Sequence, residues 1–231
     1  GLSHSQDGLG MRIGIDFDNT IAGYDALFAA LAEERGLFQN ARHSAPHGVL
    51  LGAPVGKKDL RDALRQRPEG ELTWRRLQAE AYGGRMSDAE LLDGVDRFVK
   101  ACRQAGISLS IVSHKTQHAN FASDGTDLRK AAIRWMEEHG FFDPAGLKFR
   151  PDDVFFADTR AAKVAKISDL NCNWFIDDLE EVFAEPGFPA SARAVLYDPH
   201  GDVEAGSSGA TDFLRCRHWD EIGGHVFGSH H

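Results

Sequence analysis

Short apolar runs alternate with amphipathic segments along most of the chain. The runs have the lengths and the branched or aromatic residues that are typical of buried strands. They lie, in chain order, at residues 11–17, 107–112, 154–156, 173–176 and 194–197. Between these runs, apolar residues spaced three and four apart predict helices at residues 95–105, 127–139 and 161–170. Strands that alternate with helices indicate a parallel, doubly wound α/β sheet.

The segment between the first two predicted strands, residues 22–93, has a different pattern. Its predicted elements are helices, and it carries no strand signal. The helices are predicted at residues 24–35, 57–66 and 71–82. Residues 37–56, rich in Gly, Pro, His and Ala, predict a loop, and the capping-box pattern at Ser87–Glu90 predicts another short helix. We therefore expect a helical cap at residues 22–93, inserted into an α/β core formed by residues 1–21 and 94–231.

The composition limits the cellular location and the partners of the protein. A formal net charge of −9 argues against a nucleic-acid partner, which usually requires a basic face. No apolar run approaches the roughly 20 residues of a membrane span, and residues 1–10 lack the charged and apolar regions of a signal peptide. The three cysteines show no CxxC spacing, so we expect free thiols in a reducing cytoplasm.

Polar side chains follow several of the predicted strands at the points where they end. They are Asp16, Asp18 and Thr20 at the end of the first strand, Ser113, His114 and Lys115 at the end of the second, and Asp177 and Asp178 at the end of the strand at 173–176. Ligands of an open parallel sheet bind outside the carboxyl ends of the strands, so we expect these residues to converge. Unpaired carboxylates are costly to bury, whereas clustered carboxylate oxygens beside a phosphate site suit Mg²⁺.

Four motifs occur along the chain in a fixed order: "DFDNT", "IVSHK", the lysine of "RAAKVAKI" and "FIDDLEEV". Each is weak alone, but in this order, and each after the expected element, they resemble the four motifs of the haloacid dehalogenase (HAD) superfamily of phosphohydrolases. The resemblance spans about residues 11–185. It implies a three-layer, Rossmann-like α/β core with a small helical cap inserted after the first motif.

The resemblance implies a chemical role for each aspartate. Asp16 would attack phosphorus and form an aspartyl-phosphate intermediate. Asp18 would protonate the leaving oxygen and then deprotonate the attacking water. Mg²⁺ would be held by Asp16, by the backbone carbonyl of Asp18 and by Asp178, with Asp177 close to the ion or bound to it.

Other residues of the motifs would bind the substrate. Ser113 and Thr20, together with backbone N–H groups, would hold phosphoryl oxygens. Asn19, His114 and Lys115 stand beside them in the sequence and would complete the substrate pocket.

A lysine of the third motif would neutralise charge in the transition state and steady the nucleophile. Lys163 and Lys166 lie about one helical turn apart, so either could point to the site. Lys163 is the preferred candidate, because Ile167 and Leu170 then follow on the buried face of the helix.

These roles favour Mg²⁺-dependent hydrolysis of a small phosphorylated metabolite. Superfamily members that cleave carbon–halogen bonds need no acid for the departing halide, and they resemble this pattern without an aspartate at the place of Asp18. An inserted cap implies a small substrate enclosed under a moving lid. Two alternatives stay open: a phosphomutase that uses the same aspartates, and a non-catalytic regulator that binds a phosphate or a metabolite.

Simpler interpretations apply to the same aspartates when each motif is taken alone. Asp16 and Asp18 could belong to a surface turn. Asp177 and Asp178 could stabilise a helix N-terminus, which favours negative charge. The presence of the companion motifs argues against both interpretations.

Overall fold

The computed structural model describes residues 10–37, 57–119, 125–203 and 212–228, and the chain divides into two compact units. The first, called the sheet unit here, combines Gly1–Ala22, Leu91–Thr116 and Met136–His231. The second, the helical unit, combines Gly23–Glu90 and Gln117–Trp135. Residues 117–135, which the sequence pattern places in the core, thus group with the helical unit. None of the described helices is long and apolar enough to cross a membrane.

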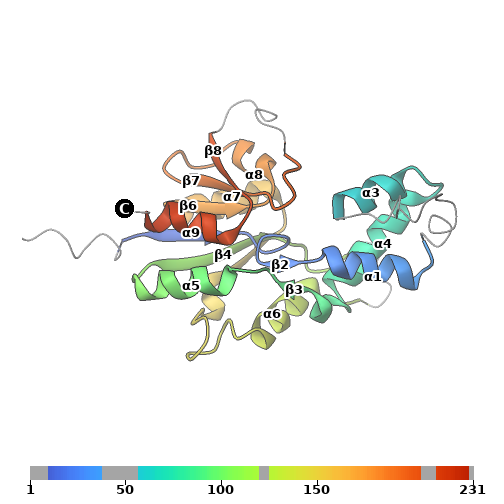
Figure 1. Ribbon diagram of the computed structural model, residues 1–231, viewed down its shortest axis with the longest axis horizontal. Coiled ribbons are helices and arrows are strands. Elements are labelled where there is room, and N and C mark those ends of the chain that lie inside the picture. Colours follow the sequence, from blue (N-terminus) through green and yellow to red (C-terminus); the bar gives the residue numbers. More distant parts are fainter. Residues whose placement is uncertain (1–9, 38–56, 120–124, 204–211, 229–231) are drawn as a thin grey trace, which may run out of the picture. The chain divides into compact units, whose positions relative to one another are not determined.

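Six strands of the described chain form one sheet, in the order β5-β4-β1-β6-β7-β8 (Figure 1). The strands are β1 (Arg12–Ile15), β4 (Ser108–His114), β5 (Val154–Ala157), β6 (Trp174–Asp177), β7 (Arg193–Tyr197) and β8 (Phe213–Cys216). All neighbouring strands are parallel. β1 lies between β4 and β6, where Ile15 pairs with Ile111 and Ile176. The parallel α/β sheet that the sequence predicts is confirmed, and β8 is an additional strand.

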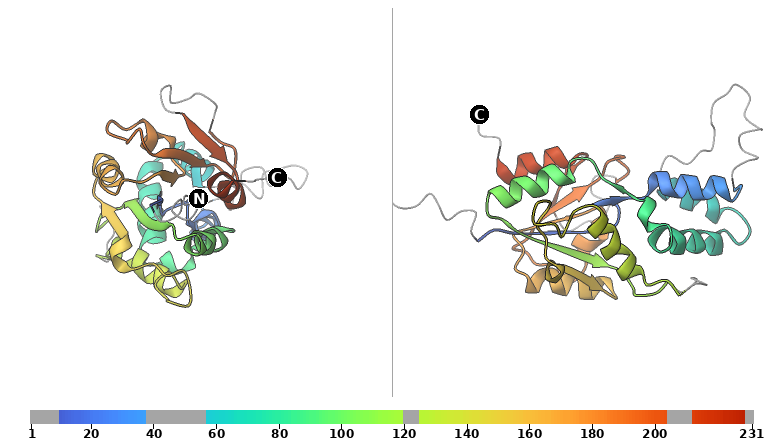
Figure 2. Two further views of the ribbon diagram at one scale, coloured as in Figure 1. Left: turned by 90° about the vertical axis from the view of Figure 1, so that its left-hand side faces the viewer. Right: turned by 90° about the horizontal axis from the view of Figure 1, so that it is seen from below.

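Helices cover both faces of this sheet and complete three layers (Figure 2). α5 (Val95–Gln104) and α9 (Trp219–Phe227) lie on one face, and α7 (Arg160–Asp169) and α8 (Glu180–Ala184) lie on the other. Val164 and Ile167 of α7 pack against Phe175 of β6 in a fully buried cluster. On the opposite face, the rings of Phe98 and Trp219 lie 5.1 Å apart. The expected three-layer core is confirmed.

Gly14, in the middle of β1, allows close packing beneath α7. A Cβ atom at this position would lie 2.7 Å from Cδ2 of Phe175 and 3.0 Å from Sγ of Cys172. Successive side chains of a strand point to opposite faces, so Ile13 and Ile15 point away from α7. Asp16, the next residue in the alternation, then returns to the α7 side, which determines where its carboxylate can lie.

We predict that Gly14→Ala destabilises the protein by about 1–3 kcal/mol, because the added methyl group overpacks the contact with Phe175. Gly224→Ala is the matched control, since Gly224 lies within α9 and a Cβ atom there meets nothing within 4 Å. Alanine favours a helix over glycine by about 1 kcal/mol, so this control should be neutral or stabilising. Urea denaturation measures both free energies of unfolding; equal stabilities of the two variants would contradict the packing argument.

The helical unit has its own aromatic core. It contains α1 (Asp25–Glu34), α3 (Lys57–Arg65), α4 (Gly70–Tyr82) and most of α6 (Leu128–Glu138). The ring of Phe28 lies 4.9 Å from that of Trp74, and the ring of Tyr24 lies 4.7 Å from that of Tyr82. Trp135 of α6 donates a hydrogen bond from its indole Nε1 to the carbonyl oxygen of Ala89, at 2.9 Å. This contact helps to explain why residues 117–135 group with the helical unit.

The expected helix at Ser87–Glu90 is wrong. Met86–Asp88 forms a single 3₁₀ turn, and Glu90–Leu91 forms a short strand, β3, which pairs with β2 (Ala22–Gly23). A left-handed Gly94, with φ of 91°, follows too soon for a helix to develop. Strands this short leave no alternating pattern to detect. The predicted loop at residues 37–56 lies, apart from Leu37, outside the described residues.

Candidate active site

The adjacent strands β1 and β6 bring Asp16 and Asp177 together. Asp16 directly follows β1, and its backbone N–H donates to the carbonyl oxygen of Ile176 at 2.8 Å, continuing the ladder between the strands. Asp177 is the last residue of β6. Each lies two residues after a position that faces α7: Gly14 on β1, where an added Cβ would meet Phe175, and Phe175 itself on β6. The strand pairing and the alternation therefore direct both carboxylates to the same place.

Lys163 joins these two carboxylates from α7. Its Nζ lies 2.7 Å from Oδ1 of Asp16 and 2.7 Å from Oδ2 of Asp177, and its side chain is only 3% exposed. The helix begins after Thr159, whose hydroxyl accepts a hydrogen bond from the backbone N–H of Ala162. Lys166 lies elsewhere, with its Nζ 4.1 Å from the centre of the Phe155 ring. Of the two candidate lysines, the structure brings Lys163 to Asp16.

The burial of these charges shifts their pKa values. Burial and repulsion from Asp16 raise the pKa of Asp177, although Lys163 partly opposes the shift. Burial alone would lower the pKa of Lys163, but attraction to Asp16 and Asp177 outweighs it, and the pKa is raised. Lys163 therefore remains an ammonium ion at neutral pH, fixed against the carboxylate of Asp16.

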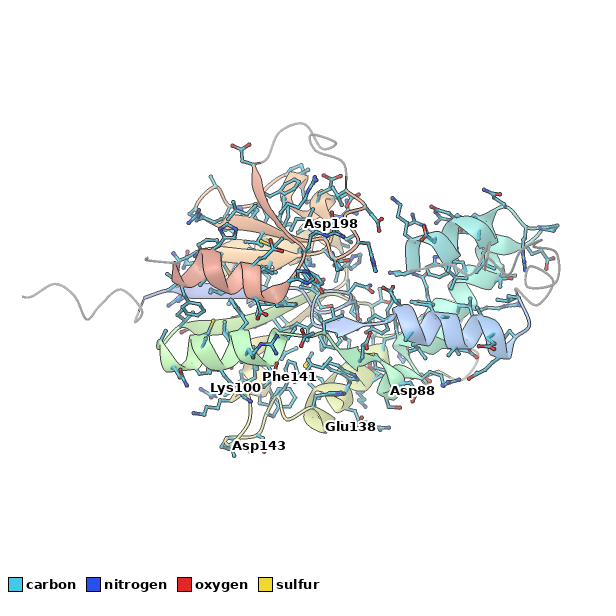
Figure 3. All side chains as sticks on the ribbon, viewed as in Figure 1. Asp88, Lys100, Glu138, Phe141, Asp143 and Asp198 are labelled. Carbon is cyan, nitrogen blue, oxygen red and sulfur yellow. The ribbon has the colours of Figure 1, made fainter. Side chains whose placement is uncertain are left out.

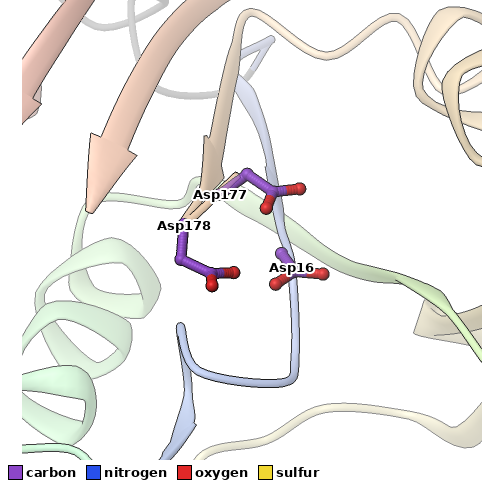
Figure 4. Close-up of side chains that lie close together, drawn as sticks. All are labelled: Asp16, Asp177 and Asp178. Atoms are coloured by element: carbon purple, nitrogen blue, oxygen red, sulfur yellow. The ribbon is translucent and has the colours of Figure 1, made fainter. Parts of the chain in front are cut away.

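Asp16, Asp177 and Asp178 form an acidic group at the ends of β1 and β6 (Figure 4). Each contributes one carboxylate oxygen, and these oxygens lie within 4.8 Å of one another. The hydroxyl of Thr20 lies 2.9 Å from Oδ2 of Asp16 and 3.1 Å from Oδ1 of Asp178, so it bridges the two residues. Hard carboxylate oxygens at this separation suit Mg²⁺, and the residues present therefore fit that ion.

The two aspartates of β6 have different surroundings. Asp177 is fully buried, with Oδ1 accepting the backbone N–H of Leu179 and Oδ2 facing Lys163. Asp178 is half-buried and reaches the hydroxyl of Thr20. Asp178 is thus the more accessible of the two to a metal ion, while Asp177 holds Lys163 in place.

The turn after β1 is held by its own backbone and by α9. Asn19 has a left-handed φ of 62°, and its N–H donates to the carbonyl oxygen of Ala22 at 2.7 Å. The indole Nε1 of Trp219 donates to the carbonyl oxygen of Thr20 at 2.9 Å. The predicted substrate residues Asn19 and Thr20 therefore help to shape the site itself. Nothing in the sequence around Trp219 indicates its contact with this turn.

Ser113, near the end of β4, offers a polar group that the protein itself does not use. The residue is 1% exposed, and within the described part of the chain its hydroxyl has no hydrogen-bond partner. A buried hydroxyl normally finds a partner. A bound oxygen, such as that of a phosphoryl group, would satisfy it.

His114 and Lys115, which the sequence places together in the substrate pocket, have different environments. His114 is exposed, and its Nε2 lies 3.1 Å from the carbonyl oxygen of Asp158. Lys115 is buried, and its Nζ lies 2.9 Å from Oδ2 of Asp18. The pairing of Lys115 with Asp18 is a feature that the sequence motifs do not indicate.

Other buried reactive groups in the sheet unit have structural explanations. Asp198, at the end of β7 (Figure 3), accepts hydrogen bonds from the backbone N–H groups of Asp202 and Val203 at 3.0 and 3.3 Å and so closes its own loop. The three cysteines are free and buried, as expected from their spacing. Burial raises the pKa of the Cys102 thiol to about 12 and that of the Cys172 and Cys216 thiols to about 11, which leaves them poor nucleophiles.

Comparisons with known proteins identify the fold. No family model and no curated protein matches the sequence. Three solved structures resemble this chain along almost their whole length: the putative HAD-hydrolase YfnB from Bacillus subtilis bound to magnesium, a HAD family hydrolase from Deinococcus radiodurans R1 with bound phosphate and sodium, and the L-2-haloacid dehalogenase RSc1362.

The similarity lies in the structure more than in the sequence. YfnB is 16% identical with a TM-score of 0.55, and the match covers 94% of this chain and 98% of that one. The Deinococcus hydrolase is 15% identical with a TM-score of 0.53, covering 95% and 96%. The dehalogenase is 13% identical with a TM-score of 0.56, covering 94% and 99%. This chain therefore has the fold of the haloacid dehalogenase superfamily, as its four motifs predict.

Proposed function

We propose that this protein is a Mg²⁺-dependent phosphomonoester hydrolase that acts on a small phosphorylated metabolite through an aspartyl-phosphate intermediate. The observation that carries the proposal is the arrangement of the two aspartates of "DFDNT". Asp16 lies against Lys163 and the acidic group, whereas Asp18, two residues later, pairs with a different lysine, Lys115. This arrangement supports the role of nucleophile for Asp16, beside carboxylates that suit a cation, and the role of proton donor and acceptor for Asp18.

Mg²⁺ fits the oxygen donors at the end of the sheet. Asp16, Asp178 and the backbone carbonyl of Asp18 would hold the ion, while Asp177 keeps its contact with Lys163. A bound Mg²⁺ would offset the repulsion between the negative charges of the phosphate and those of the carboxylates. YfnB, which shares the fold, was solved bound to magnesium.

The protein's own residues would divide the reaction into two steps. In the first, a carboxylate oxygen of Asp16 forms a bond to phosphorus as the ester oxygen leaves, and Asp18, carrying a proton taken from solvent or from the water of the preceding turnover, donates that proton to the leaving oxygen. In the second, Asp18 takes a proton from a water molecule whose oxygen attacks phosphorus, and the bond to Asp16 breaks. The ammonium group of Lys163 and the buried hydroxyl of Ser113 would stabilise the phosphoryl oxygens in both steps.

Carbon–halogen cleavage is the reaction named for one of the similar structures, the L-2-haloacid dehalogenase RSc1362. A halide leaves as a stable anion and needs no proton, so that reaction would give Asp18 no task. The carboxylate of Asp18 therefore favours an oxygen leaving group.

The sequence leaves two alternatives open, a phosphomutase and a non-catalytic regulator. Both differ from a hydrolase because neither would let inorganic phosphate accumulate.

We predict that the purified protein releases inorganic phosphate from members of a panel of sugar phosphates, nucleotides and phosphoamino acids when Mg²⁺ is present. Removal of the metal with EDTA should lower the rate by about 100-fold or more, because a metal ion contributes several kcal/mol of charge stabilisation. Readdition of Mg²⁺ should restore it. A parallel assay measures halide release from 2-haloacids. Halide release without phosphate release would contradict the proposal, and phosphate that stays on organic products would indicate a mutase.

A further inference from the structure

Of the described residues, two lysines are buried, and they contact different aspartates of the turn after β1. Lys163 contacts Asp16, and Lys115 contacts Asp18. The two lysine side chains are equally inaccessible, each 3% exposed. Charges are expensive to bury unless they are paired. The turn therefore holds its two carboxylates in two separate ion pairs, although only one residue lies between them.

The backbone is fixed at both ends of the pair between Lys115 and Asp18. The backbone N–H of Lys115 donates to the carbonyl oxygen of Ala157 at 2.9 Å, extending the ladder between β4 and β5. Asp18 forms an isolated bridge with Ala22, next to the left-handed Asn19. With both backbones held, the freedom that remains is rotation of the two side chains, of which that of Asp18 is the shorter. Its contact with Lys115, 2.9 Å from Nζ to Oδ2, restricts that rotation.

We propose that Lys115 is a positioning residue that holds the carboxylate of Asp18 for proton exchange with the leaving oxygen and with water. The inference rests on the proposed hydrolase function. Lys115 acts through Asp18 and carries no charge stabilisation of the phosphoryl group, which is the task of Lys163. The partly exposed Asp18 side chain, 19% against 3% for Lys115, is the member of the pair that solvent and substrate can reach.

The proposal makes a prediction that depends on the leaving group. An alkyl phosphate needs a proton on its leaving oxygen, whereas 2,4-dinitrophenyl phosphate does not, because dinitrophenolate is a stable anion. In Lys115→Met, kcat/KM for an alkyl phosphate should fall by about 100-fold, the lower end of what general acid catalysis contributes. For the dinitrophenyl ester, kcat/KM should stay within about threefold of wild type, since only bond formation by Asp16 limits that step.

The second step supplies an independent readout. In this step water removes the phosphoryl group from Asp16, and Asp18 acts as the base. The step is the same whichever ester supplied the phosphoryl group. Lys115→Met should therefore show a rapid burst of one equivalent of dinitrophenolate, followed by slow turnover, in stopped-flow measurements. A general loosening of the fold would slow phosphoryl transfer from both esters and would give no burst.

Three further variants complete the experiment. Asp18→Asn should reproduce the leaving-group pattern of Lys115→Met, and Lys166→Met, a lysine outside the site, should match wild type. The double variant Asp18→Asn/Lys115→Met leaves no unpaired buried charge and is the fallback if Lys115→Met does not fold. Because Lys115 acts through Asp18, the double variant should be no slower than Asp18→Asn alone.

The outcomes separate this inference from the function on which it rests. Equal losses of kcat/KM for both esters, or a double variant slower than Asp18→Asn, would mean that Lys115 binds the phosphoryl group, and the inference would be overturned. Unchanged rates for both esters would overturn it as well. If the wild-type protein cleaves neither ester in the presence of Mg²⁺ and no other phosphate ester either, the proposed hydrolase function itself fails.

Discussion

Asp16→Asn is expected to lower phosphate release by at least about 1000-fold, because a neutral amide cannot replace a carboxylate as the attacking group. The substitution preserves the size of the side chain, and Lys163 keeps its second partner, Asp177. The fold should therefore survive. Phosphate release at saturating Mg²⁺ measures the loss of turnover. Mass spectrometry of acid-quenched wild-type protein should detect a phosphoryl group on Asp16, which must be missing from the variant.

Asp152→Asn is the matched control for this experiment. Asp152 belongs to the 3₁₀ turn at Pro151–Asp153, and its side chain is 89% exposed. The same change of charge at this position should leave the rate within about twofold of wild type, as expected of a surface substitution. Turnover by Asp16→Asn near the wild-type rate would show that another residue is the nucleophile.

Lys163→Met is expected to lower the free energy of unfolding by about 3–5 kcal/mol at neutral pH. The substitution removes the cation that lies 2.7 Å from both Asp16 and Asp177 and leaves two buried carboxylates facing each other. Lys166→Met is the matched control, one helical turn away, and should cost at most about 1 kcal/mol for its lost contact with the ring of Phe155. Urea denaturation of both variants without metal measures the difference.

The loss of folding stability in Lys163→Met should depend on pH and on Mg²⁺. The pKa of Asp177 is already raised in the folded protein, so folding favours its protonated form. A carboxyl group with a raised folded pKa stabilises the fold more as the pH falls, and the defect of the variant should shrink on acidification. Mg²⁺ should reduce the defect as well, since the ion offsets the repulsion between carboxylates that Lys163 no longer neutralises and therefore stabilises the variant more than wild type. Equal stabilities of the Lys163 and Lys166 variants would contradict the assigned contacts.

The predictable part of the fold is the part that follows from a regular pattern. The buried strands β1, β4 and β6 and the amphipathic helices α5 and α7 agree with the runs and spacings of their apolar residues. β8 has only one fully buried residue, Cys216, so no apolar run marks it. α9 contains Gly223 and Gly224, which disfavour a helix, and it forms around the buried Trp219 and Ile222. Tertiary packing decides such elements.

The predictable part of the candidate site is the part that strand ends determine. Asp16, Asp177 and Lys163 come together because parallel strands end at one edge and α7 lies over them. The partner of Lys115 depends on which strands are neighbours and on how a long, flexible side chain turns, and neither is visible in a sequence. The same holds for the hydroxyl of Thr20, which is expected to bind phosphate but contacts Asp16 and Asp178.

The position of β1 between β4 and β6 has a consequence for the synthesis of the protein. The ribosome synthesises β1 and Asp16 early. It synthesises β6, which pairs with one side of β1, together with Asp177 and Asp178, about 160 residues later. A nascent chain that ends before β6 contains Asp16 without the other carboxylates of the acidic group. Pairings between such distant segments form slowly. Binding of the proposed metal ion would therefore require that residues 11–178 have been synthesised and have folded together.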